Sequence, residues 1–137
     1  MENKLDSGFQ IKDLILVESS FRRIGNVSFE KDVNKSFNVN VESFVNDNTI
    51  TVAVEATVAQ KLQDIEQFNI RVKMIGIFEH IGDTLITDFE RFGKVNGAAI
   101  IFPYIREHVT NLSSKAGMGA ILLPPVNFTK MPEKQQA

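Results

Sequence analysis

The sequence contains no cysteine and no tryptophan, and it has a single tyrosine among 137 residues. The absence of cysteine excludes disulfides, thiolate metal sites, iron–sulfur clusters and thiol nucleophiles. No apolar run approaches the roughly 18–20 residues that cross a bilayer, and residues 1–6 lack the apolar stretch of a signal peptide. With 15 basic against 17 acidic residues, the chain lacks the basic surplus of a nucleic-acid-binding protein. These absences predict a soluble, cytoplasmic protein that neither inserts into a membrane nor binds DNA or RNA.

The length fits one domain with one hydrophobic core, so we expect residues 1–137 to form a single domain. A chain of this size buries enough surface to fold without a disulfide or a metal ion. Residues 129–137 combine Pro132 with mixed polar residues. This composition predicts a poorly ordered tail.

What the chain has in excess is phenylalanine, with 11 copies. A phenylalanine side chain offers a large apolar face and no polar group that must be hydrogen-bonded. Eleven such rings are many for one small core. We therefore expect some of them at a subunit interface or on a binding surface.

Four segments in the first half alternate between apolar and polar residues and are rich in β-branched side chains, a pattern typical of half-buried strands. They are residues 9–17, 37–41, 49–58 and 68–74. In the first of them, Phe9, Ile11, Ile15 and Val17 fall on one face and Leu14 and Leu16 on the other.

The connections between these segments predict antiparallel pairing. Asn46–Asn48 is a short turn that makes a hairpin of the second and third segments. Gln60–Glu66 is another short link, between the third and fourth segments. Arg22–Lys35 is much longer, and a loop of that length is typically functional or crosses over a sheet.

After Gly82 the apolar spacing becomes helical, with apolar residues recurring every three or four positions over 98–112. Asn96 is a candidate N-cap, and Gly117 and Gly119 are candidate stop signals. Residues 83–92 are a candidate shorter helix. The predicted fold class is α+β: a four-stranded antiparallel sheet with a long crossover loop after the first strand, followed by one long helix.

No arrangement of residues predicts catalysis. The two histidines, His80 and His108, lack the spacing of a metal site. Nucleophile-elbow, Walker and dinucleotide-binding motifs are absent. We therefore expect neither an enzyme nor a resident metal or cofactor.

Several short motifs occur in an order that resembles one protein family. The most specific are Phe102-Pro103-Tyr104-Ile105-Arg106-Glu107 and, about twenty residues on, Pro125-Val126-Asn127-Phe128. Together they resemble the signature region of the SecB family of molecular chaperones. Three upstream segments are also similar to that family: Phe9–Ile11, Phe29–Asp32 and Gly76–Phe78.

The resemblance implies a four-stranded sheet backed by a long helix, assembled as a homotetramer, a dimer of dimers in which strands of two subunits form one eight-stranded sheet. It also implies an ATP-independent holdase that binds unfolded polypeptides, such as preproteins for Sec-dependent export, in exposed apolar grooves lined partly by the crossover loop. Without nucleotide, a chaperone acts by binding the unfolded state by mass action.

Transferred residue by residue, the resemblance assigns three sets of contacts. The client-binding residues are Phe29, Val33, Phe37, Val39, Val41, Val126 and Phe128. For the strand residues Phe37, Val39 and Val41, burial in the core is an equally good interpretation. The residues of the oligomer interface are Tyr104, Ile105, Arg106 and Val109.

The third set concerns the export ATPase SecA, for which the resemblance makes Glu18 the contact. Arg22 stands where export members of the family carry an acid, and Arg23 follows it. Two cations there weaken complementarity to a basic partner. Two alternatives to export therefore stay open: a SecB-like chaperone dedicated to one client, such as the antitoxin of a toxin–antitoxin pair, and a protein-interaction scaffold that is not a chaperone.

Overall fold

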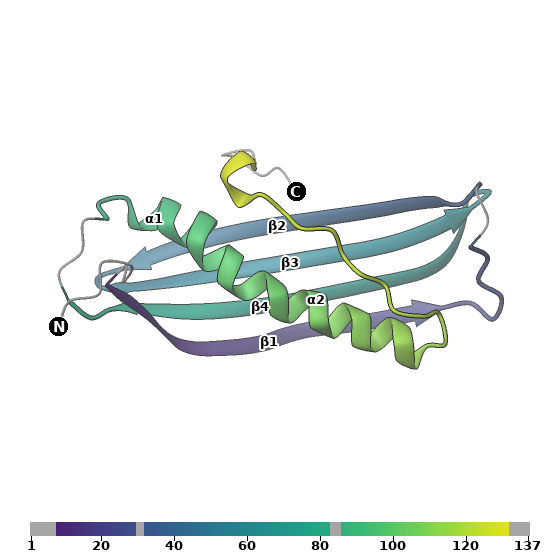
Figure 1. The fold of residues 1–137 in the computed structure, drawn as a ribbon, viewed down its shortest axis with the longest axis horizontal. Coiled ribbons are helices and arrows are strands. Elements are labelled where there is room, and N and C mark those ends of the chain that lie inside the picture. The colour runs from purple at the N-terminus through teal and green to yellow at the C-terminus, as the bar shows by residue number, and fades with distance from the viewer. Residues whose placement is uncertain (1–7, 30–31, 83–85, 132–137) are drawn as a thin grey trace.

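The structure, a computed structural model, describes residues 8–29, 32–82 and 86–131. Four long strands form one antiparallel sheet in the order β1-β4-β3-β2 (Figure 1). Their bounds are β1 Phe9–Arg23, β2 Asn34–Asn46, β3 Thr49–Leu62 and β4 Ile65–His80. The predicted four-stranded antiparallel sheet is confirmed, and each strand is longer than its alternating segment.

A single stretch of helix covers one face of this sheet (Figure 1). It consists of α1 (Phe89–Phe92), a π-helical turn η1 (Gly93–Gly97) and α2 (Ala98–Lys115). The N-cap is Asp88, whose carboxylate accepts a hydrogen bond from the backbone N–H of Arg91 at 3.0 Å. The prediction that Asn96 caps the long helix is therefore wrong, since Asn96 lies inside the π turn.

Glycines bring the start of the helix into close contact with the sheet. A Cβ added to Gly93 would lie 2.8 Å from Ile50 Cγ2, and one added to Gly97 would lie 3.0 Å from Val52 Cγ2. The first distance is shorter than real Cβ contacts, and the second is tighter than most of them. The same two glycines look like helix breaks in the sequence, which is why the helix is longer than its apolar pattern predicts.

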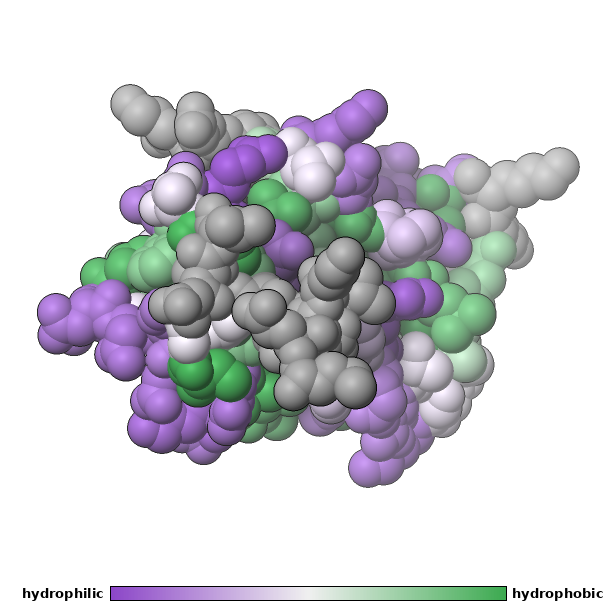
Figure 2. Space-filling view, turned by 60° about the vertical axis from the view of Figure 1, so that its left-hand side comes forward, coloured by the Kyte–Doolittle hydropathy of each residue, from purple (hydrophilic) through white to green (hydrophobic). Residues whose placement is uncertain are grey.

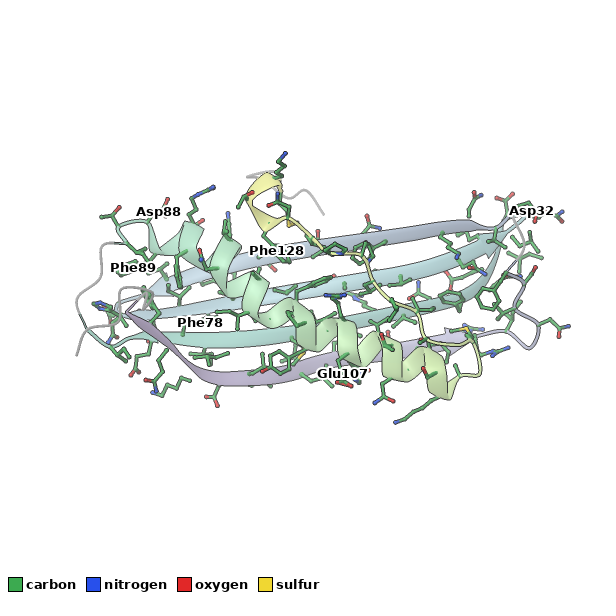
Figure 3. All side chains as sticks on the ribbon, in the orientation of Figure 1. Asp32, Phe78, Asp88, Phe89, Glu107 and Phe128 are labelled. Atoms are coloured by element: carbon green, nitrogen blue, oxygen red, sulfur yellow. The ribbon has the colours of Figure 1, made fainter. Side chains whose placement is uncertain are left out.

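The core lies between the helix and the inner face of the two central strands. One face of β3 is entirely buried, and Phe78 of β4 lies against Gly97 beneath the helix (Figure 3). From the helix, Ile101, Ile105 and Val109 are fully buried against this face. The alternation read from the sequence correctly gives the inner face of β3 and β4.

In β1 the alternation fails, because the pairing with β4 shifts register twice, between Ile11 and Asp13 and again between Leu16 and Glu18. Each β-bulge reverses which side chains face the core. Phe9 is buried and Leu14 is half-buried. The apolar side chains between and beside the bulges remain exposed: Ile11, Ile15, Leu16 and Val17.

After Gly117, which has a φ of 74°, the chain crosses the helix-covered face toward β2 without regular structure (Figure 1). This extended segment is anchored by the buried Leu123 and by the Ile121 N–H, which donates to Ser113 Oγ at 2.9 Å. It ends in a short 3-10 helix, η2 (Phe128–Lys130). Two of the residues predicted to form a tail, Thr129 and Lys130, thus belong to η2, while 132–137 lie outside the described residues.

Figure 2 shows apolar side chains reaching the surface in separate patches set among polar ones. None of the helices in the described part of the chain combines the length and the apolar character needed to cross a membrane.

Candidate functional site

The connection between β1 and β2 carries the most prominent exposed phenylalanine of the predicted site, Phe29, whose side chain is 54% exposed. Arg23 fixes the first residues of this connection. The guanidinium donates hydrogen bonds to the carbonyl oxygens of Ile24 at 2.9 Å and Gly25 at 3.0 Å, and also to that of Ala116 at the end of α2. A cation here also meets the negative end of the helix dipole. Arg23 is therefore structural, which leaves Arg22 as the exposed cation of the pair.

An open groove of about 440 Å³ lies between the helix and the extended C-terminal segment. Val95 and Ala99 line it on the helix side, and Pro125–Thr129 line it on the other. Pro124 and Pro125 hold the backbone of this segment in a stiff, extended path. The groove is thus apolar and bounded on one side by a chain with little conformational freedom.

Three phenylalanines meet next to this groove. Phe128 packs edge-to-face on Phe102, with the ring centroids 5.7 Å apart and the planes at 74°. The ring of Phe37 of β2 also lies near Phe102, at 6.4 Å between centroids. Phe128 is 7% exposed, so its ring belongs to the core of the subunit and forms the floor of the groove.

The structure spreads the predicted client-binding residues over two places. Phe29 and Val33 belong to the crossover connection, whereas Phe37, Val126 and Phe128 border the groove or its aromatic floor. By exposure, Phe29 is exposed, Val33, Phe37 and Val126 are half-buried, and Val39, Val41 and Phe128 are buried. For Val39 and Val41 the structure thus shows the core position that the sequence left open.

The predicted oligomer interface divides in the same way. Ile105 and Val109 are fully buried against the sheet of their own subunit, so neither side chain is available to a second subunit. Tyr104 and Arg106 flank this buried stripe of α2, and both are exposed. The correction follows from helical geometry, because residues next to each other in a helix point in different directions.

Glu18, the predicted SecA contact, faces a cation on the outer face of the sheet. Arg71 Nε lies 3.7 Å from Glu18 Oε1, and Arg71 Nη2 lies 2.8 Å from Glu55 Oε2. The hydrogen bond to Glu55, followed by the charges of Glu55 and Glu18, raises the pKa of the Arg71 guanidinium above its ordinary value. Arg71 therefore stays charged and offsets the acidity that Glu18 would present to a basic partner.

Several exposed apolar residues at the crossover end were missed by the sequence analysis. Leu122, on the extended segment, has the highest exposed fraction of them, at 76%. Ile24 and Ile65 are also exposed. Leu122 and Leu123 are adjacent in an extended chain, where neighbouring side chains point in opposite directions. That arrangement was the available signal that one of the two leucines would face outward.

No group of three or more His, Cys, Asp or Glu side chains gathers where it could hold a metal ion within residues 8–29, 32–82 and 86–131. His108 Nε2 lies 2.8 Å from Ser19 Oγ and ties α2 to β1. His80 packs among the rings of Phe9 and Phe89, at 5.4 Å and 5.9 Å between centroids. Both histidine side chains thus make contacts that join elements of the subunit.

Residues 4–137 match the family model described as preprotein translocase subunit SecB. Among curated relatives, a protein-export protein SecB of Polaromonas is 30% identical, over 99% of this chain and 93% of its own length. One from Verminephrobacter eiseniae is 29% identical, over 94% and 87%. A third, from Acidovorax, is 37% identical, but the match spans only 63% of this chain and 57% of that relative's length.

The fold is also found in a solved structure, a SecB-like chaperone of Mycobacterium tuberculosis in complex with a ChAD peptide from an antitoxin. The TM-score is 0.72, over 87% of this chain and 91% of the other, at 14% sequence identity. At 14% identity, this structural likeness shows that the two chains share a fold, and no more.

Proposed function

We propose that this chain, which belongs to the SecB family, is an ATP-independent holdase that binds unfolded polypeptides in the cytoplasm. The observation that carries the proposal is apolar surface left uncovered at the crossover connection and on the extended segment, together with an apolar groove. Phe29 and Leu122 are more than half exposed, and the groove offers about 440 Å³ next to an extended segment. Exposed apolar surface of this kind typically marks a binding site.

The chemistry of this surface suits clients of many sequences. Phenylalanine and leucine side chains make non-directional contacts, so they do not require a matching hydrogen-bond partner on the client. Each client side chain that becomes fully buried is worth roughly 1.5–3 kcal/mol. Several such contacts along one extended chain combine into useful affinity through multivalency.

We assign direct client contact to the residues that keep exposed surface and support to those that do not. The contact residues are Phe29, Val33, Phe37 and Val126, joined by Leu122. The supporting residues beneath them are Val39, Val41 and Phe128. The stiff path through Pro124 and Pro125 lowers the conformational entropy that binding costs.

The proposal is tested by adding the purified protein, without nucleotide, to several unrelated proteins diluted from denaturant and following their aggregation by light scattering. A holdase suppresses the aggregation of each of them near stoichiometric ratio. Suppression of none would contradict the holdase. Suppression of a single one would favour the dedicated-client alternative, and tight binding to one folded partner would favour the scaffold.

We further propose that the subunits assemble as a dimer of dimers. Two surfaces support this assembly: the bulged strand β1, where Leu16 and Val17 are exposed, and the exposed surface of α2, to which Tyr104 and Arg106 belong. Uncovered apolar residues on an edge strand expose a monomer to aggregation. A monomeric mass in light scattering at micromolar concentration would contradict the assembly.

The choice between export and a dedicated client depends on the outer face of the sheet. Arg71 beside Glu18, together with the exposed Arg22, reduces the acidity of that face. This argues against delivery to SecA, and the dedicated-client alternative has a parallel in the solved SecB-like chaperone of the same fold, which is in complex with an antitoxin peptide. Binding of purified SecA at low salt, lost in Glu18→Gln, would instead support export.

A further inference from the structure

A β-bulge brings two glutamines together beneath the crossover connection. In the pairing of β3 with β4, Gln60 is opposite Phe68 and Lys61 is opposite Glu66, so Gln67 has no partner in the ladder. The bulge turns Gln67 to the same face as Phe68, and both are buried. Gln60 is 0% exposed and Gln67 is 4% exposed.

The two side-chain amides hold the backbone of one residue of the crossover connection, Ser28, from both sides. Gln60 Nε2 donates to the Ser28 carbonyl oxygen at 2.7 Å and to Gln67 Oε1 at 2.9 Å. The Ser28 N–H donates to Gln67 Oε1 at 3.2 Å. The backbone of β4 adds a further tie, because the Ile24 N–H donates to the Gln67 carbonyl oxygen at 3.0 Å. The N–H and the carbonyl oxygen of Ser28 are thus both hydrogen-bonded, as they would be to a neighbouring strand. Phe29 is the next residue.

These glutamines are poorly suited to a purely stabilising role. Gln60 Oε1 is buried and has no hydrogen-bond partner in the part of the chain that the structure describes. A buried acceptor without a partner is destabilising. Two apolar side chains at this end of the sheet would fill the space without that penalty, but they would remove the partners that the amides give to the Ser28 N–H and carbonyl oxygen. The two amides thus hold the backbone at Ser28 while leaving one buried acceptor unpaired, and local rules are typically broken in this way at functional positions.

We propose that Gln60 and Gln67 are positioning residues that hold Phe29 in place for the client. This inference rests on the proposed function. Without the two amides the connection from Ile24 to Phe29 loses its attachment at Ser28, and the ring samples other positions. A client must then order the connection when it binds, which lowers affinity, whereas a ring held in its binding position avoids that entropy cost.

The test is a double-mutant cycle on client affinity, in which a fluorescently labelled unfolded protein is titrated with the full chain in its native assembly. The variants are Gln67→Leu, Phe29→Ser and the two combined. We expect Gln67→Leu to weaken binding by about three- to tenfold when Phe29 is present and by less than about twofold when it is serine, because coupled positions are not additive. Equal effects in both backgrounds, or no effect of Gln67→Leu with Phe29 present, would overturn the positioning role.

A second variant keeps the test decisive if Gln67→Leu does not fold. Gln60→Leu removes both of its own bonds and also the unpaired acceptor, so we expect it to fold while weakening client binding in the same Phe29-dependent way. Tight binding by Gln60→Leu, equal to that of the original chain, would contradict the proposal. Failure of the holdase itself is a different result, since the original chain would then not bind the labelled unfolded protein.

Discussion

Replacing Phe29 with serine removes a benzyl ring of which 54% is exposed, and the loss of client affinity can be worked out from that fraction. A phenylalanine buries about 200 Å² when fully covered, so the exposed part offers a client roughly 100 Å². At about 25 cal/mol per Å² this is roughly 2.5 kcal/mol. A client that covers the whole exposed ring loses about 70-fold in Kd, and one that covers half of it loses about eightfold.

The assay is a titration of a labelled unfolded protein with Phe29→Ser, and the matched control is Phe44→Ser. Phe44 is 57% exposed but lies on β2 next to the buried Ser43, so its ring projects from the opposite face of the sheet. We expect Phe44→Ser to change Kd by less than about twofold, since its ring lies on the face of the sheet opposite to the helix. A similar loss in both variants would show that general surface hydrophobicity binds the client, and an unchanged Kd for Phe29→Ser would refute the assignment.

Four further substitutions test the packing and the assembly. Phe128→Ser should destabilise the subunit by about 3–5 kcal/mol, as deletion of a buried aromatic ring does, and a urea transition that moves by less than about 1 kcal/mol would place the ring outside the core. Gly93→Ala should cost about 1–3 kcal/mol by overpacking, because its Cβ would lie 2.8 Å from Ile50 Cγ2; an unchanged thermal midpoint would contradict the close helix–sheet contact. Ser43→Ala should leave stability equal or higher, since the hydroxyl is buried with no partner among the described residues, and a clear loss of stability in urea would disprove that. Leu16→Asp should lower the mass measured by light scattering with unchanged circular dichroism, and a mass that stays the same would remove β1 from the interface.

The regular parts of the fold could be predicted from the sequence, because burial there follows a simple period. The inner face of β3 is a clear case, since every second residue from Ile50 to Val58 is buried. The helix beyond Ala98 follows its apolar spacing in the same way. Its start could not be found, because Gly93 and Gly97 look like breaks until their contact with the sheet is known.

The irregular parts could not be predicted, and they include much of the candidate site. The bulges of β1 and the one at Gln67 interrupt the alternation at single residues, and nothing in a single sequence marks where a ladder loses register. Phe29 and Phe128 are the same residue type in similar loop contexts. Only the packing of Phe128 on Phe102 distinguishes a core ring from an exposed one.

The central claim, that an exposed apolar surface on the helix-covered side receives unfolded chains, is tested most directly by site-specific photo-cross-linking. A benzophenone side chain is placed at position 29 in one variant and at position 44 in another, and each is irradiated with several unrelated unfolded proteins and with their native forms. We predict cross-links from position 29 to every unfolded protein and to none of the native forms, with little product from position 44. Equal yields from the two positions, or no product from position 29, would contradict the claim.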